Sequence, residues 1–271
     1  MVRPVWFVNL LKKTFPNIKF IAKLTRVPLI GKFIDLLLFK GDSLFYLVND
    51  KVIEINKSLP LQAEMVLPSE VAEYFVRKSS VIKVMNFCIC RDANKCKDYP
   101  IDFGCLFLGE AANGINPELS RTMSQDEAIA YLKRCRDAGL IHLIGRNKLD
   151  TVWLNVKPGS KLLTICNCCS CCCLWRIIPD LKKSISHKVS RMPGIKITVS
   201  NQCAGCGRCT ENVCFADAIH IINERAVISD NCKGCGRCID VCARKAIVLT
   251  IDDKHFINEA INQIEFLVDV S

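Results

Sequence analysis

Several patterns that mark common protein classes are missing from this 271-residue chain. No stretch reaches the roughly 20 consecutive apolar residues that a membrane-spanning helix requires. No GxGxxG turn, P-loop or flavin-type motif occurs, which argues against binding of NAD, ATP or FAD by the chain itself. Helix-turn-helix and zinc-finger spacings are missing as well, so we expect no nucleic-acid partner. Histidine is scarce, with 4 residues, and His142 has no second histidine at a ligand-like spacing.

The apolar residues near the N-terminus are interrupted too early for a secretory signal peptide. Lys12, Lys13, Lys19 and Lys23 break them up before a hydrophobic segment of adequate length forms. We therefore expect a reducing, cytoplasmic location. Half of the residues are hydrophobic, so the chain can bury a sizeable core.

Cysteine is the residue that the chain has in excess, with 19 copies. Six of them fall within residues 166–173: Cys166, Cys168, Cys169, Cys171, Cys172 and Cys173. An unpaired thiolate is costly to bury, and free thiols this close oxidise readily, so we interpret the run as a metal site with a soft cation. Disulfides are disfavoured because the chain is long and its spacings are the short CxC and CxxC kind that bind metals.

A second cysteine set precedes the central run, with the spacing CxCx5Cx8C over Cys88, Cys90, Cys96 and Cys105. Residues i and i+2 of an extended backbone point to one side, so the first two can face the same centre, and the other two would complete four ligands. This spacing favours an iron–sulfur centre over structural zinc. Arg91 follows directly and would either offset the negative charge of a cluster or lie in solvent.

These ten cysteines are more than two four-ligand clusters need. Neighbouring side chains in the central run diverge, so one cubane does not easily take all six of its thiols. We therefore expect two [4Fe-4S] centres in the N-terminal part, with one non-standard cluster of higher nuclearity as the alternative.

A repeat of 29 residues occupies the C-terminal part. Cys203, Cys206 and Cys209 are followed by Cys214, and the same pattern returns as Cys232, Cys235 and Cys238 followed by Cys242. Over about residues 195–251 this repeat resembles the bacterial-type ferredoxin with two [4Fe-4S] clusters. The resemblance implies that Cys203, Cys206, Cys209 and Cys242 hold one cluster, and that Cys232, Cys235, Cys238 and Cys214 hold the other.

Two features of the repeat depart from that family. Four residues instead of three separate Cys209 from Cys214, and Phe215 and Ala243 stand where proline is usual. All eight ligand positions are nevertheless cysteine. The formal charge of +10 would fall to about +2 with four oxidised clusters of about −2 each, so the basic balance needs no nucleic acid to explain it.

The hydrophobic pattern predicts an α+β protein, in which a cysteine-rich α/β N-terminal domain precedes a ferredoxin-like domain. We expect an amphipathic basic helical arm over 1–42, a cysteine-rich metal-cluster domain over 43–176, a basic linker over 177–194, the ferredoxin domain over 195–251 and a C-terminal extension over 252–271. The arm would pack on the domain or on a partner subunit. Its lysine-rich and aromatic faces would also suit peripheral membrane contact.

Local signals predict the individual elements. Ser124–Glu127 is a capping box before a helix that ends at Gly139, with Cys135 in its buried face. Strands are expected at 44–48 and 52–55 with a turn at 49–51, and further strands at 141–144, 152–156 and 162–165. In the ferredoxin-like part we expect strands at 195–200, 218–222, 226–228 and 246–250, and residues 104–114 are expected to form a short buried helix.

The N-terminal motifs at Phe87–Arg91, Gly104–Gly109 and Ile165–Cys173 are similar to a group of cysteine-rich iron–sulfur proteins of anaerobes that carry such a domain before a ferredoxin. We therefore expect an iron–sulfur protein that relays low-potential electrons between a redox partner and N-terminal clusters, as an electron-carrier subunit more than a stand-alone oxidoreductase. One alternative is a redox enzyme with a catalytic non-standard cluster at Cys166–Cys173. The other is a factor that delivers a cluster or an electron to another anaerobic enzyme.

Overall fold

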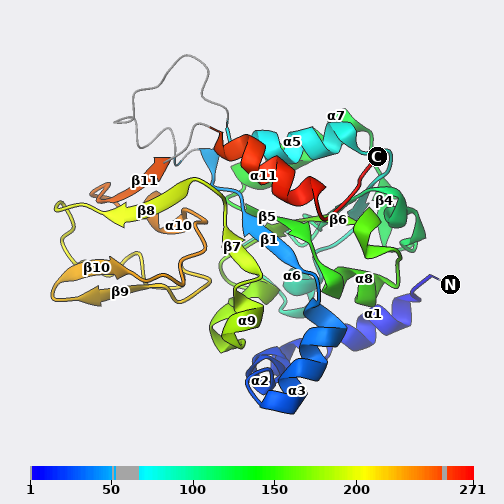
Figure 1. Ribbon diagram of the computed structural model, residues 1–271, viewed down its shortest axis with the longest axis horizontal. Helices are drawn as coiled ribbons and strands as arrows, with labels where there is room; N and C mark the ends of the chain where they lie inside the picture. The colour runs from blue at the N-terminus through cyan, green and yellow to red at the C-terminus, as the bar shows by residue number, and fades with distance from the viewer. Residues whose placement is uncertain (1, 51, 53–66, 252–254) are drawn as a thin grey trace.

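The computed structural model describes residues 2–50, 52, 67–251 and 255–271. Its main feature is a seven-stranded mixed sheet, and two small two-stranded sheets follow in the C-terminal part (Figure 1). The α+β class expected from the sequence is confirmed. Residues 53–55 of the second strand expected at 52–55 lie outside the described residues, and Val52 is helical, so the expectation was wrong at that residue.

The large sheet has the order β4-β2-β3-β6-β5-β1-β7. Its strands are β1 (Ser43–Tyr46), β2 (Ile82–Met85), β3 (Leu106–Leu108), β4 (Ser120–Thr122), β5 (Ile141–Arg146), β6 (Leu163–Cys168) and β7 (Val189–Arg191). All neighbours pair antiparallel except β1 and β7, which are parallel. The segment expected as a basic linker therefore contributes a strand to the main sheet.

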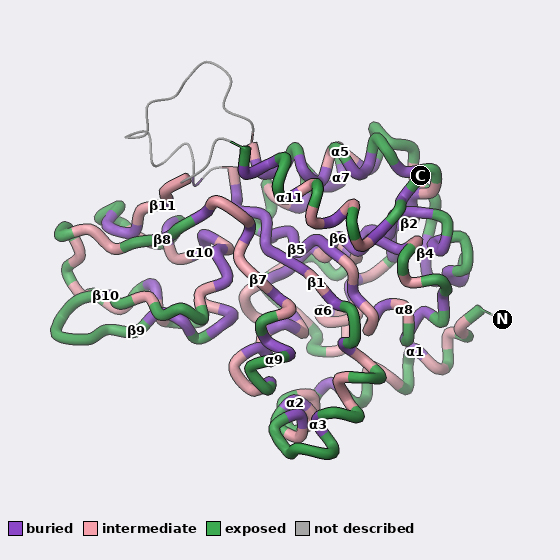
Figure 2. Tube along the Cα trace, in the orientation of Figure 1, coloured by how far each residue is buried: buried purple, intermediate pink, exposed green. Residues whose placement is uncertain are grey.

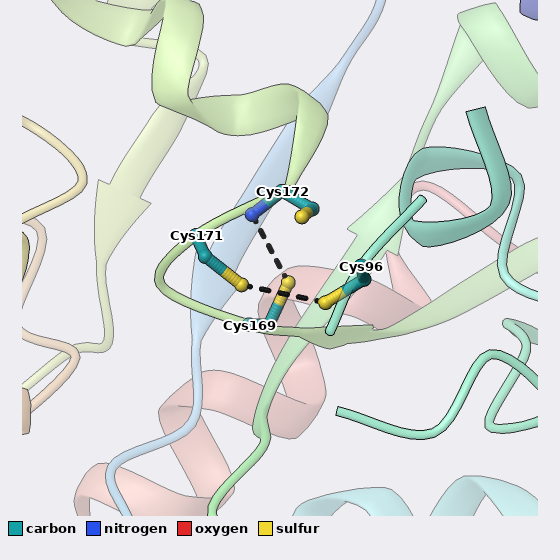
Figure 3. Close-up of side chains that lie close together, drawn as sticks. All are labelled: Cys96, Cys169, Cys171 and Cys172. Carbon is teal, nitrogen blue, oxygen red and sulfur yellow. Dashed lines mark hydrogen bonds between the residues drawn. The ribbon is translucent and has the colours of Figure 1, made fainter. Parts of the chain in front are cut away.

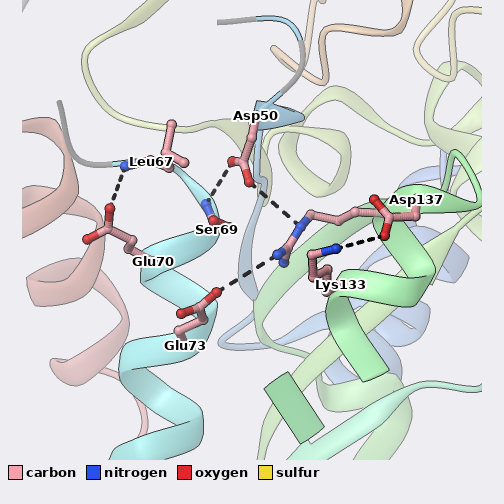
Figure 4. A network of polar contacts seen from close by, with 8 residues as sticks. Asp50, Leu67, Ser69, Glu70, Glu73, Lys133 and Asp137 are labelled. Atoms are coloured by element: carbon pink, nitrogen blue, oxygen red, sulfur yellow. Dashed lines mark hydrogen bonds and ion pairs between the residues drawn. The ribbon is translucent and has the colours of Figure 1, made fainter. Parts of the chain in front are cut away.

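Helices cover both faces of this sheet (Figure 1). One face carries α5 (Ser69–Lys78), α7 (Gln125–Asp137) and α11 (Phe256–Glu265), and the other carries α6 (Ile89–Ala93) and α8 (Lys148–Leu154). The capping box of α7 is confirmed, because Ser124 and Glu127 bond to each other's backbone N–H. Arg136 of α7 forms ion pairs with Asp50 and Glu73, which joins α7 to α5 and to the end of the first strand segment (Figure 4).

The first forty residues form a chain of short helices. These are α1 (Val5–Lys12), the 3-10 helix η1 (Phe15–Asn17), α2 (Ile18–Leu24), α3 (Pro28–Ile34) and the π-helix η2 (Asp35–Phe39). They pack on the domain: Lys12 forms an ion pair with Asp92 of α6 at 2.5 Å, and Thr25 accepts a hydrogen bond from the N–H of Lys182. Within the described residues, no helix is both long enough and apolar enough to cross a membrane.

The C-terminal module follows β7 directly. It contains β8 (Ile195–Val199), β9 (Ile219–Ile222), β10 (Arg225–Ile228), α10 (Arg237–Asp240) and β11 (Ile247–Ile251), with β8 paired to β11 and β9 paired to β10. The four strands expected in this part are confirmed. Between β6 and β7 lie the 3-10 helix η5 (Leu174–Asp180) and α9 (Lys183–Ser186).

Two local expectations were wrong. Residues 152–156 were expected as a strand, but α8 runs through Leu154, because the side chain of Asn147 caps it by accepting from the N–H of Leu149. Residues 104–114 were expected as one helix, but they form β3 and then the 3-10 helix η3 (Glu110–Gly114). Leu106 and Leu108 are fully buried between neighbouring strands, and that burial outweighs local helix preference.

Candidate metal centres

The sheet topology brings the N-terminal cysteines to one edge. Strands β2 and β6 both pair antiparallel with β3, so the carboxyl ends of β2 and β6 and the start of β3 lie together. Cys88 follows β2, Cys105 precedes β3, and Cys166 and Cys168 end β6. Because side chains alternate along a strand, the two β6 cysteines share one face of the sheet.

Seven cysteines of this edge line one cavity of about 340 Å³, and Cys169 is one of them. The six other than Cys169 are called the inner set: Cys88, Cys90, Cys105, Cys166, Cys168 and Cys173. Helices of the N-terminal arm roof the cavity with Phe7, Leu11, Phe15, Ile18 and Ile21. The arm therefore has an inner apolar face that encloses the thiols and an outer face that is largely exposed (Figure 2).

The remaining four N-terminal cysteines form a compact outer set. The sulfur atoms of Cys96, Cys169, Cys171 and Cys172 all lie within 4.8 Å of one another, and Cys96 comes from the loop after α6 while the other three come from the loop after β6 (Figure 3). Grouping by sequence spacing therefore differs from grouping in space. Cys96, which we expected beside Cys88, Cys90 and Cys105, lies instead with the central run.

Arg91 lies near cysteines of both sets and is fully buried. Its guanidinium donates to the carbonyl oxygens of Pro100 and Asn167 at 2.8 Å each and to that of Phe103. Although burial opposes its charge, nearby Cys88 and Cys169 contribute to raising its pKa. A buried cation needs a compensating anion, and the groups available to it here are thiolates. The expectation of charge compensation by Arg91 thus fits its surroundings, and a solvent-exposed position is wrong.

Contacts within the inner set divide its thiols into donors and acceptors. The pKa of Cys88 is lowered to about 7, chiefly by a hydrogen bond from the thiol of Cys90. The pKa of Cys168 is lowered well below its ordinary value, because Cys166 and Cys173 both hydrogen-bond to it. These hydrogen bonds favour the thiolate, the form that binds metals, at Cys88 and Cys168, and they raise the pKa of the donors Cys90, Cys166 and Cys173.

The eight cysteines of the C-terminal repeat surround two further cavities. Cys203, Cys206, Cys209 and Cys242 line one of about 220 Å³. Cys214, Cys232, Cys235 and Cys238 line the other. The structure thus brings together the two groups of four that the ferredoxin resemblance implies, and their ligation of clusters stays a prediction.

Backbone N–H groups in this module point to cysteine sulfurs in a repeated way. Ala218 donates to Cys214 and Ala246 donates to Cys242, each four residues along the chain and each at 3.3 Å. Bonds of this kind stabilise thiolates and tune the reduction potential of a bound cluster. In addition, the buried Nε of Arg237 beside the second cavity has no hydrogen-bond partner among the described residues. The backbone N–H groups that donate to these sulfurs and the unpartnered Nε of Arg237 both fit a bound cluster of negative charge.

Three residues important to the site were not found by sequence reasoning. Tyr46 of β1 is fully buried, and its ring stacks on that of Phe215, with centroids 5.2 Å apart. Arg237 donates to the carbonyl oxygen of Cys168 at 2.6 Å. Asp150 lines the inner cavity and accepts hydrogen bonds from Trp153, Thr164 and Asn147, and burial raises its pKa to about 6. Phe215 stands where the family that the repeat resembles usually has proline, and this was the one sequence feature that pointed to the contact with Tyr46.

His142 and Cys135 belong to the packed interior. His142 is 2% exposed, and burial lowers its pKa to about 3. Cys135 is fully buried on α7, and burial raises its pKa to about 12. Cys135 fits the buried position that we expected for it, and His142 is packed in the interior.

Comparison with known proteins bears on the C-terminal module. Residues 210–251 match the LdpA Fe-S cluster-binding domain. This part of the chain is an iron–sulfur cluster-binding segment. The matched range contains all four cysteines of the second cavity and Cys242 of the first. No curated protein and no solved structure matches the chain.

Proposed function

We propose that this protein relays low-potential electrons from a redox partner, through two C-terminal [4Fe-4S] clusters of ferredoxin type, to a centre in the inner-set cavity. Iron–sulfur clusters supply one-electron redox chemistry when bound, typically near −400 mV for ferredoxins. The similarity of residues 210–251 to a cluster-binding domain and the two four-cysteine cavities support the first part of this route.

The first cavity lies where a partner can reach it. Cys206 in its wall is exposed, whereas Cys235 in the wall of the second cavity is half-buried. The second cavity faces the main domain, because Lys233 in its lining donates to the carbonyl oxygen of Ser186 at 3.0 Å. We therefore place the entry of electrons at the first cavity and their exit at the second.

The module packs tightly on the large sheet near the second cavity. Gly234 has a φ of +71°, and a Cβ there would lie 2.5 Å from Cγ of Arg191, the last residue of β7. The side chain of Arg191 donates to the carbonyl oxygen of Cys232 at 3.3 Å. Glycine at 234 therefore allows the cluster loop and the sheet edge to approach closely.

The observation that carries the proposal is the position of Tyr46. In the sheet register Tyr46 lies opposite Leu143, and Leu143 lies opposite Cys166 of the inner set. The other side of Tyr46 stacks on Phe215, which directly follows Cys214 of the second cavity. Tyr46 thus lies between two cysteine groups, with the ring of Phe215 toward one and Leu143 toward the other. Close packing of this kind excludes water along the whole contact.

A freeze-quench experiment tests the route. The full chain, purified without oxygen, is reduced by a photoreduced flavin and followed by EPR. We expect signals of the C-terminal clusters to appear first and the signal of the N-terminal centre to follow. In Cys235→Ser, which disrupts the second cavity, the N-terminal signal should be delayed or lost. Reduction of the N-terminal centre at an unchanged rate in this variant would contradict the proposal.

A second candidate function is a redox enzyme that reduces a small substrate in the inner cavity. The specific support is the buried carboxyl of Asp150 in a wall that also carries seven cysteines. A substrate reduction needs protons as well as electrons, and Asp150 is a group that could supply them. Turnover of a substrate that Asp150→Asn abolishes, while electron transfer into the cavity persists, would favour the enzyme.

A further inference from the structure

The outer set differs in spacing from every other cysteine group in the part of the chain that the structure describes. Among the described residues, it alone brings three or more possible ligand atoms, here the cysteine sulfurs, within 4.8 Å of one another. A single tetrahedral ion with metal–sulfur bonds of about 2.3 Å holds its four sulfurs about 3.8 Å apart. A cubane binds each cysteine through a separate iron, which sets the sulfurs about 6 Å apart.

We propose that Cys96, Cys169, Cys171 and Cys172 bind one tetrahedral metal ion, zinc or a single iron, and not a [4Fe-4S] cluster. The closest contact within the set joins the sulfurs of Cys96 and Cys171, at 3.5 Å. This is near the edge length of a tetrahedral site and well short of a cubane's. The inference concerns metal content alone and does not depend on the route of electrons.

The C-terminal cysteines provide an internal comparison. Residues 210–251 match a cluster-binding domain, and four of their cysteines surround a common cavity. No three of those sulfurs lie within the limit that the outer set meets. Cysteines placed for clusters are therefore spread more widely in this structure, and the compactness of the outer set is a property of that set.

Surrounding groups brace the outer set as they do in structural metal sites. The N–H of Cys172 donates to the sulfur of Cys169 at 3.3 Å (Figure 3). Arg176 donates to the carbonyl oxygens of Ser170 and Cys171 and so holds the loop after β6. Nδ2 of Asn94 bonds to the carbonyl oxygen of Cys172 at 3.3 Å, which ties this loop to the one that carries Cys96.

Charge is balanced as well. Four thiolates and one divalent ion together carry about −2. The guanidinium of Arg91 lies against Cys169, and that of Arg176 is bound to the same loop. Two positive charges therefore accompany the site. Bonds from neighbouring groups of this kind orient the ligands and stabilise the ion.

The assignment also changes the count for the inner set. With four cysteines committed to one ion and eight to the C-terminal cavities, six thiols remain on one cavity and Cys135 remains in the core. Six thiols are too many for a cubane. The ion would act as a clamp, because it joins the loop after α6, the helix of Cys90, to the loop after β6, which follows Cys168 and contains Cys173.

Metal analysis of the full chain, purified without oxygen, tests the proposal. Zinc, iron and acid-labile sulfide are measured in the wild type, in Cys171→Ser and Cys96→Ser, and in the control Cys135→Ser, whose thiol belongs to no cysteine group. We expect each outer-set variant to lose one zinc, or one iron without sulfide, and the control to lose nothing. X-ray absorption should show that ion with four sulfurs at about 2.3 Å and no metal neighbour.

Two results would overturn it. The first is loss of several irons together with an equal amount of sulfide in the outer-set variants, which would mean a cluster. The second applies even if the variants do not fold: a wild type without zinc whose iron absorption shows only clustered metal. Zinc in the wild type assigns the ion as zinc, and an isolated iron signal assigns it as iron.

Discussion

The ring of Tyr46 stacks on the ring of Phe215 with centroids 5.2 Å apart and planes 9° from parallel. Phe215 occupies the position after Cys214 where the ferredoxin family usually has proline. The substitution gives the cluster loop an aromatic face, and β1 supplies the partner ring. This contact connects the C-terminal module to the large sheet at Tyr46, which lies opposite Leu143, and Leu143 in turn lies opposite Cys166.

Substitutions at Tyr46 separate its ring from its hydroxyl. Tyr46→Leu removes a stack worth about 1 kcal/mol and should slow electron transfer to the N-terminal centre. Tyr46→Phe keeps the ring and removes a buried hydroxyl that has no hydrogen-bond partner among the described residues, so stability should hold or rise. Thermal unfolding and freeze-quench EPR of both variants provide the measurement. Equal slowing in the two would show that the ring is not what matters.

Arg91 should set the potential of the N-terminal centre. Arg91→Gln removes a fully buried positive charge beside the cysteines, so added electrons are stabilised less and the potential should fall. Breaking the buried charge pairing should also destabilise the fold by about 3 kcal/mol. Arg91→Lys, which keeps the charge and loses the planar fork, is the control. Redox titration followed by EPR would disprove this if the glutamine variant kept the wild-type potential.

The inner face of the arm should protect the N-terminal centre from air. Phe15 is 7% exposed and lines the cavity, so Phe15→Ala should open the roof and cost about 3 kcal/mol. Phe20 lies on the outer face at 64% exposure, and Phe20→Ala should change stability by less than about 0.5 kcal/mol. Loss of visible absorbance in air measures the effect. We expect faster bleaching only in the first variant, and similar bleaching in both would count against a shielding role.

The outer face of the arm should bind anionic vesicles. Leu29 and Phe33 are 81% and 62% exposed there, and Lys19, Lys23 and Lys32 lie on the same arm. Apolar side chains flanked by lysines suit the surface of an anionic bilayer. Co-sedimentation with vesicles should fall with salt and with Leu29→Ser, while Ile222→Ser, an exposed position on the C-terminal module, serves as control. Sedimentation that both variants reduce equally would show no role for this face.

Asp42 should make stability depend on pH. Burial raises its pKa to about 7, against the lowering effects of the Lys148 N–H and of nearby Lys188 and Arg146. Between pH 4 and 7 the folded state keeps a proton that the unfolded chain releases, so stability falls as pH rises. Asp42→Asn should remove this slope, which is at most about 1.4 kcal/mol per pH unit. Thermal midpoints at pH 5.5 and 7 check it, and parallel changes in wild type and variant would refute it.

Local sequence information determined much of this protein. The capping box placed α7, the alternation of side chains placed the strands of the C-terminal module, and the ferredoxin resemblance implied its two groups of four cysteines. The helix and the strands depend on residues close together in the chain. Short-range hydrogen bonds and alternation are enough to specify them.

Tertiary structure decided how the ten N-terminal cysteines divide. Cys96 is close in sequence to Cys90 but lies in space with Cys171, because the antiparallel pairing of β3 with β2 and β6 brings the loops at that sheet edge together. It also decided that Tyr46 lies between two cysteine groups, since three strands and a separate module meet there. The contact between Cys96 and Cys171 joins residues 75 positions apart, and no local pattern encodes which of many possible pairings forms.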